Sequence, residues 1–183
     1  VSWALLATLA VAPGIAQDLS IRFFDVGQGD AALITSPEGK SVLIDGGGYA
    51  GWPAYLLDSL GIDTLTLVIA SHNHADHIRG LQSAFETTIV NYYMDNGLPA
   101  NTQAYRRLLD LVEGSGVTYL KATPRTVQLG SATLRVLPST PGDTSQNNSS
   151  VGVLLSYGPF TALFTGDAEG EEYFVVDGLA VVD

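Results

Sequence analysis

The sequence of 183 residues contains no cysteine, only three histidines and only eight lysine and arginine residues together. Without cysteine, it can form no disulfide scaffold, cysteine-ligated zinc site, iron–sulfur cluster or thiol nucleophile. The net charge of −11 argues against a broad nucleic-acid-binding surface, because such surfaces cluster lysine and arginine. Apolar residues make up 46% of the chain and charged ones 15%, which predicts a folded domain with a sizeable core.

The first 16 residues carry no charge and form an apolar run about as long as the hydrophobic part of a signal peptide. Gly14 and Ala16 supply small residues at the positions expected for cleavage before Gln17. A stable membrane span needs about 20 apolar residues, and Pro13 cuts this run short. We therefore predict a bacterial protein that is periplasmic or secreted. A buried first strand and the tail of an upstream membrane helix are the alternatives.

Short apolar segments separated by turn residues predict a single α/β domain over residues 17–183, with one large sheet or two sheets and helices outside. The first three strands should form an antiparallel meander, and the unbroken apolar run at 64–71 is typical of a strand covered on both faces. The expected strands are 19–26, 31–36, 41–47, 64–71, 87–94, 117–122, 125–129, 132–138, 151–158 and 160–167. The expected helices are 53–60, about 76–84, and one that begins at Asn101 or Thr102 and ends near Gly114.

All three histidines lie within six residues, directly after the apolar run at 64–71. His72 and His74 are two residues apart, so in an extended loop they can point the same way and bind one cation. Asp76 and His77 follow at the expected start of a helix, where they can serve a second cation nearby. Two such ions can hold a bridging hydroxide nucleophile. A hydrogen-bonded turn or a chance cluster is the alternative, but the use of every histidine in one segment favours a metal site.

The pattern His-x-His-x-Asp-His after a hydrophobic strand resembles the signature of the metallo-β-lactamase-fold hydrolases. Further segments in the same order resemble the hydrolase domain of the ComEC competence proteins and its stand-alone secreted relatives. These segments are FDVGQGDA at 24–31, LIDGG at 43–47, NNSSV at 147–151 and LFTGDAE at 163–169. The resemblance covers about residues 19–183. It implies an αββα sandwich of two mixed β-sheets with outer helices, incomplete at the C-terminus.

The resemblance also implies a set of ligands for two divalent metal ions, zinc or manganese. His72 and His74 would bind the first ion, and Asp76 and His77 the second. Asp167 would bridge both ions.

Three more polar residues are expected around the metals. Asn147 stands where many relatives have another histidine, and is a tentative oxygen ligand. Asp30 and Asp45 would lie beside the metals and orient His72 and His74, although turn-forming carboxylates are the alternative for both. We also expect the carboxylate at position 76 to take or give a proton as the catalytic residue.

These observations predict a metal-dependent hydrolase in which hydroxide held by two metal ions attacks a phosphodiester or related ester. ComEC-like domains are associated with DNA degradation or uptake, but a charge of −11 repels a polyanion and favours a small phosphoester over nucleic acid. A catalytically degenerate, metal-binding domain that acts in binding or assembly is the alternative. The family's last motif, a His–His pair, would follow 179–183, so the second metal site and the activity of this chain stay open. The sequence does not indicate an oligomeric state.

Overall fold

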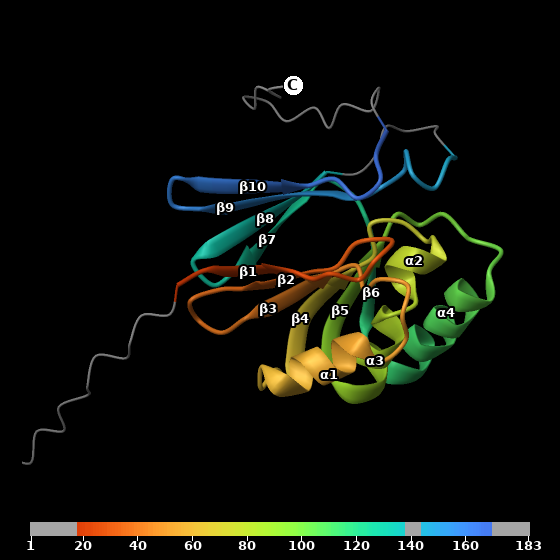
Figure 1. Ribbon diagram of the computed structural model, residues 1–183. Coiled ribbons are helices and arrows are strands. Elements are labelled where there is room, and N and C mark those ends of the chain that lie inside the picture. The colour runs from red at the N-terminus through yellow and green to blue at the C-terminus, as the bar shows by residue number, and fades with distance from the viewer. Residues whose placement is uncertain (1–17, 138–143, 170–183) are drawn as a thin grey trace, which may run out of the picture.

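The computed structural model describes residues 18–137 and 144–169 (Figure 1). The expected signal peptide at 1–16 and the final apolar segment at 179–183 lie outside the described residues. The strands are β1 (Ser20–Phe23), β2 (Ala32–Thr35), β3 (Ser41–Ile44), β4 (Thr64–Ile69), β5 (Ile89–Asp95), β6 (Thr118–Lys121), β7 (Arg125–Leu129), β8 (Ala132–Leu137), β9 (Gly152–Tyr157) and β10 (Phe160–Phe164). The helices are α1 (Trp52–Ser59), α2 (Ala75–Ile78), α3 (Leu81–Thr87) and α4 (Gln103–Ser115).

The described strands form two sheets. The six-stranded sheet has the order β1-β2-β3-β4-β5-β6; its first three strands form the predicted antiparallel meander, and β3 to β6 run parallel. The four-stranded sheet has the order β10-β9-β8-β7. All of its described strands pair antiparallel, so the prediction of a mixed sheet does not hold for them. Each strand pairs with the strand that follows it along the chain, an arrangement that suits antiparallel pairing.

The core has two layers, and β4 contributes to both. Leu67 and Ile69 face the four-stranded sheet and pack in the cluster between the sheets. Val68 and Ala70 face the other way, into the cluster that the helices cover. Alternating side chains along one strand thus supply both layers, which confirms the prediction of a strand covered on both faces.

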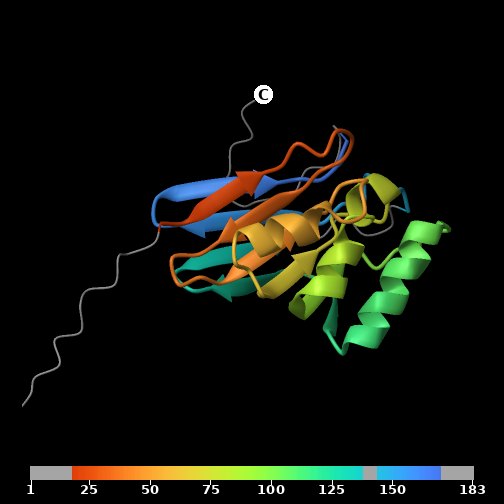
Figure 2. The same cartoon turned by 60° about the horizontal axis from the view of Figure 1, so that its bottom comes forward.

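The helices lie on one side of the six-stranded sheet (Figures 1 and 2). Leu57 of α1, Leu81 of α3 and Leu108 of α4 are fully buried against it. This arrangement confirms the α/β class. Within residues 18–137 and 144–169, no helix covers the outer face of the four-stranded sheet, and none is long and apolar enough to cross a membrane.

The prediction of a single helix at about 76–84 is wrong, because two separate helices, α2 and α3, occupy this segment. The Gly80 N–H donates to the Gly47 carbonyl oxygen at 3.0 Å. A side chain at position 80 would overlap the Gly46 carbonyl group. This close approach of two backbones needs glycine, and it presses α2, with His77, against the loop that follows β3.

Candidate metal centre

The functional side chains gather where three strands end. β3 and β4 run parallel, so their carboxyl ends meet at the same edge of the sheet. Asp45 follows β3, Ser71 and His72 follow β4, and α2 carries His77. Asp167 comes from the other sheet, directly after β10 and Gly166.

Nitrogen and carboxylate ligand atoms of His72, His77 and Asp167 lie within 4.8 Å of one another. Asp167 Oδ1 is 3.3 Å from His77 Nε2, and its Oδ2 is 3.9 Å from His72 Nε2. His74 adds a third imidazole, whose Nδ1 lies 3.0 Å from His72 Nε2. His72 and His77 are buried, whereas His74 is exposed and Asp167 partly exposed. The fold thus brings all three histidines and Asp167 together.

Asp45 holds the buried part of this cluster in place. Its carboxylate accepts hydrogen bonds from the Ser71 backbone N–H at 2.7 Å, from Ser71 Oγ at 2.6 Å and from His77 Nδ1 at 2.9 Å. The backbone of Asp45 has a φ of 55°, in the left-handed region that few residues other than glycine adopt. This conformation turns the chain sharply after β3, toward Ser71 and His77.

These hydrogen bonds assign the donor and acceptor nitrogens of both buried histidines. Because Ser71 Oγ donates to Asp45, it accepts from His72 Nδ1 at 3.0 Å. His77 Nδ1 likewise donates to Asp45, so both rings keep the Nε2 atom for a ligand. His77 Nε2 is buried and has no hydrogen-bond partner among the described residues. A buried nitrogen that faces a carboxylate without a hydrogen bond fits a divalent metal ion between them.

The surroundings give the two buried histidines opposite pKa shifts. Burial lowers the pKa of His72 to about 3, with the nearby charges of His77 and His74 acting in the same direction, so its ring is neutral and can bind a metal. Burial also lowers the pKa of His77, but the hydrogen bond and negative charge of Asp45 outweigh it and raise the pKa to about 9. A metal ion at His77 Nε2 therefore has to displace a proton.

Gly166 explains how Asp167 reaches the histidines. The φ of Gly166 is +54°, and a Cβ atom there would lie 2.7 Å from the Cβ and 2.8 Å from the Oγ of Ser71. Only glycine lets the turn after β10 come this close to the end of β4. The adjacent carboxylate is thereby carried against His72 and His77.

The other predicted site residues lie around this cluster. Asp76 is partly exposed, and its Oδ2 accepts a hydrogen bond from Gln28 Nε2 at 2.9 Å. Asn147 donates from Nδ2 to Glu169 Oε1 at 3.0 Å, while its Oδ1 is buried without a hydrogen-bond partner among the described residues. Asp76 does not belong to the group of ligand atoms formed by His72, His77 and Asp167.

Asp30 and Asp45 differ in what they contact. Asp45 orients His77 directly and His72 through Ser71, whereas no described hydrogen bond joins it to His74. Asp30 is exposed, and one of its oxygens lies within 4.8 Å of ligand atoms of Asp45 and His77. Its carboxylate therefore lies beside the hydrogen-bonded pair of Asp45 and His77.

Sequence reasoning did not predict several contacts within the site. Ser71 links Asp45 to His72, Gln28 positions Asp76, and Glu169 positions Asn147. Their positions in the sequence gave one usable signal, since Ser71 is the polar residue that separates an apolar strand from the first histidine. The contacts of Gln28 and Glu169 join segments 48 and 22 residues apart and have no local pattern.

Comparison with known proteins identifies the family. The sequence profile described as Metallo-beta-lactamase superfamily matches residues 24–180. The chain belongs to the metallo-beta-lactamase superfamily. A search of curated proteins finds no match.

Solved structures of the metallo-beta-lactamase superfamily share the fold of this chain. A metallo-beta-lactamase from Staphylococcus aureus is 20% identical with a TM-score of 0.55, over 81% of this chain and 43% of that one. A HARLDQ motif mutant of a metallo-beta-lactamase from Cronobacter sakazakii is 18% identical with a TM-score of 0.54, over 85% of this chain and 62% of that one. This chain thus corresponds to about half of the length of these structures.

The superfamily includes metal-dependent hydrolases, and its members typically bind divalent metal ions. The cluster of His72, His77 and Asp167 provides a candidate binding group of the matching kind. The resemblance found in the sequence is therefore confirmed for the superfamily as a whole.

Proposed function

We propose that this protein is a metal-dependent hydrolase that cleaves a phosphodiester or a related ester, as a ComEC-like member of its superfamily. One observation carries the proposal: the Nε2 atoms of His72 and His77 face the Asp167 carboxylate, and His77 Nε2 is buried without a hydrogen bond. Hydrogen bonds to Nδ1 of both rings fix this orientation before any ligand binds.

Two divalent ions, zinc or manganese, are the proposed cofactors. His72 and His74 would hold the first ion, His77 and Asp76 the second, and Asp167 both. When bound, such ions activate water and stabilise the negative charge that develops on the ester oxygens. The unpartnered Oδ1 of Asn147 is a further candidate ligand, and an amide oxygen there suits manganese as well as zinc.

The protein's own groups around the cluster supply orientation and proton transfer. Asp45 and Ser71 hold a proton on Nδ1 of both buried imidazoles, so that Nε2 is the atom left to bind a ligand, at His77 after it loses its proton. Asp76 is partly exposed and held by Gln28 at one oxygen, which leaves it able to exchange a proton with solvent and with the substrate. We assign proton transfer to Asp76 on this basis.

The net charge of −11 favours a small ester over polymeric DNA, because the field of the protein repels a polyanion. An assay with bis(4-nitrophenyl) phosphate, zinc and manganese tests the activity in the full-length protein, with bound metal measured by elemental analysis. His72→Ala and Asp76→Ala should each lower metal content and turnover at least about tenfold. Asp110→Asn, on the exposed face of α4, is the matched control.

The outcomes separate an enzyme from a binding module. Metal content that depends on His72, together with turnover of the diester, supports the hydrolase. Metal binding without turnover of any ester would favour a domain that acts in binding or assembly. Unchanged metal content in both variants would contradict the proposed ligands.

A further inference from the structure

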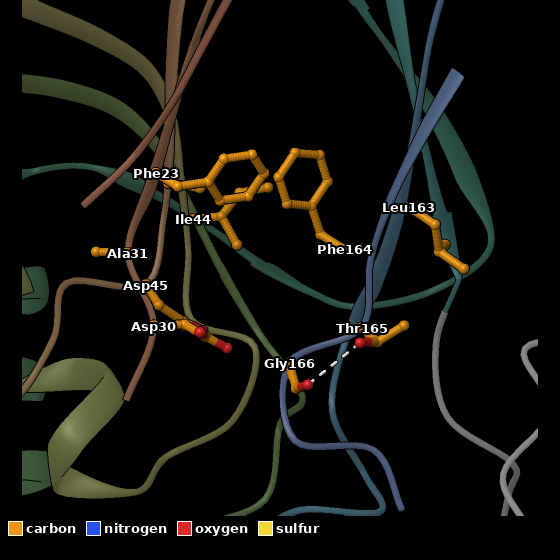
Figure 3. Close-up of a pocket in the computed structure, with 10 residues that line it drawn as sticks. Phe23, Asp30, Ala31, Ile44, Asp45, Leu163, Phe164, Thr165 and Gly166 are labelled. Carbon is orange, nitrogen blue, oxygen red and sulfur yellow. Dashed lines mark hydrogen bonds between the residues drawn. The ribbon is translucent and has the colours of Figure 1, made fainter. Parts of the chain in front are cut away.

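A cavity of about 180 Å³ opens beside the candidate metal centre, between the ends of the two sheets (Figure 3). Its lining includes Asp45, which binds His77, and Gly166, which precedes Asp167. The cavity is smaller than sites that enclose a whole drug-sized ligand. A cavity of about 150 Å³ can hold benzene, so this one has room for a single compact substituent.

One wall of the cavity is aromatic and apolar. Phe23 of β1 and Phe164 of β10 face each other with ring centroids 5.8 Å apart, whereas the Leu163 side chain points away on the other side of β10 (Figure 3). Phe23 is 73% exposed, so packing in the core does not account for this large side chain. Exposed apolar surface next to a reactive centre is a typical place for a ligand to bind.

The opposite side of the cavity is acidic. The carboxylates of Asp30 and Asp45 lie next to each other, and Asp30 is exposed to solvent (Figure 3). No lysine or arginine is among the described residues that line the cavity. The carboxylate of Asp45 already accepts hydrogen bonds from Ser71 and His77. The Asp30 carboxylate accepts no hydrogen bond from the described residues, and the basic group near it is His77, whose ligand nitrogen lies within 4.8 Å and is already paired with Asp45.

We propose that this cavity binds a compact apolar group that carries a positive charge, with its apolar body against Phe23 and Phe164 and its ammonium group toward Asp30. Aromatic faces and a carboxylate attract a cation together, whereas they disfavour an anionic group. This inference rests on the proposed hydrolase function. It assigns the substrate class of that hydrolase as small esters with an amine-bearing substituent.

Direct binding tests the cavity without turnover. Benzylammonium, benzyl alcohol and benzoate have nearly the same shape and differ in charge. Titrating each into the metal-loaded full-length protein, with methyl NMR signals of Ile44 and Ala32 as the readout, should show benzylammonium binding about fivefold or more tighter than benzyl alcohol. Benzoate should bind weakest of the three.

Two variants locate the interaction. Asp30→Asn should weaken benzylammonium about fivefold and leave benzyl alcohol unchanged, and Phe23→Ala should weaken both. Asp110→Asn removes the same charge from α4 and should change neither. Equal affinity for the cation and the alcohol, or no effect of Asp30→Asn, would overturn the proposal. Because no reaction is measured, a protein that hydrolyses esters but does not discriminate these ligands refutes the cavity assignment alone.

Discussion

The candidate metal centre has two halves that are built differently. The inner half consists of Asp45, Ser71, His72 and His77. The outer half consists of His74, Asn147, Asp167 and Glu169. Every inner side chain is at most 1% exposed, and they hydrogen-bond to one another, whereas the outer side chains are exposed or partly exposed.

This difference separates two tasks. The inner half is fixed by adjacent parallel strands and holds two imidazoles rigidly before a metal arrives. The outer half comes from loops that follow β4, β8 and β10. Under the proposed function it would complete the metal sites from the solvent side. Changes to the inner half should therefore lower both fold stability and metal affinity, while changes to the outer half should lower metal affinity alone.

The largest expected effect is that of Asp45→Ala. It leaves the Ser71 N–H and His77 Nδ1 buried without their acceptor, which should lower the free energy of unfolding by about 3–5 kcal/mol. Denaturant titration of the metal-free protein measures this loss. Asp45→Asn is the matched control, because asparagine tolerates the φ of 55° and keeps one acceptor oxygen. Equal loss in both variants would show that charge, rather than shape, holds the inner half.

The free energy of unfolding of the metal-free protein should depend on pH, because His77 in the inner half gains or loses a proton. The pKa of His77 is raised from 6.5 to about 9, so its stabilising contribution is complete below pH 6.5 and is lost as the pH rises to about 9. The pKa of His72 is lowered to about 3, so its effect is confined to the range below pH 6.5, where stability falls as the pH falls.

We therefore expect the free energy of unfolding in EDTA to decrease by about 2–3 kcal/mol between pH 6.5 and 9. Denaturant titrations at several pH values measure it. Asp45→Asn should flatten this slope, because it removes the carboxylate that raises the pKa of His77. A steep decrease that persists in Asp45→Asn would place its origin elsewhere.

Gly166→Ala tests the contact between the halves. The new methyl group would overlap Ser71, and alanine disfavours the φ of +54°. Gly158→Ala is a close control, because Gly158 has the same φ but open space around it. We expect Gly166→Ala to destabilise the fold by about 1–3 kcal/mol more than Gly158→Ala and to lower metal affinity, measured by competition with a chelator. Equal effects of the two substitutions would mean that the contact with Ser71 is unimportant.

Much of the fold followed from local patterns in the sequence. Alternating apolar runs and turn residues located the described strands to within a few residues. The break between α2 and α3 was missed because its cause is a contact between Gly80 and Gly46, far apart in the chain. The helical pattern of apolar residues in the sequence cannot reveal a contact between residues so far apart.

The candidate site was only partly predictable for the same reason. His72, His74 and His77 form a local cluster, and the fold does bring them together. That Asp45 contacts His77 rather than His74 depends on how β3 and β4 align and on the left-handed turn at Asp45, neither of which leaves a sequence pattern. The role of Ser71 likewise depends on the carboxylate that it meets across the sheet edge.

Glu169→Ala should have the smallest effect and tests the outer half alone. Glu169 is exposed and contacts the site by accepting a hydrogen bond from Asn147 Nδ2, so the fold should lose less than about 0.5 kcal/mol. Without this bond the Asn147 amide can rotate, and we expect metal affinity to fall about three- to tenfold. Glu169→Gln keeps an acceptor oxygen and should bind metal nearly as the parent does, while Glu86→Ala, an exposed partner of Arg107, controls for lost surface charge. Chelator competition with zinc and with manganese provides the readout. If Glu169→Ala instead lowers stability as Asp45→Ala does, the division into a structural inner half and a ligand-completing outer half is wrong.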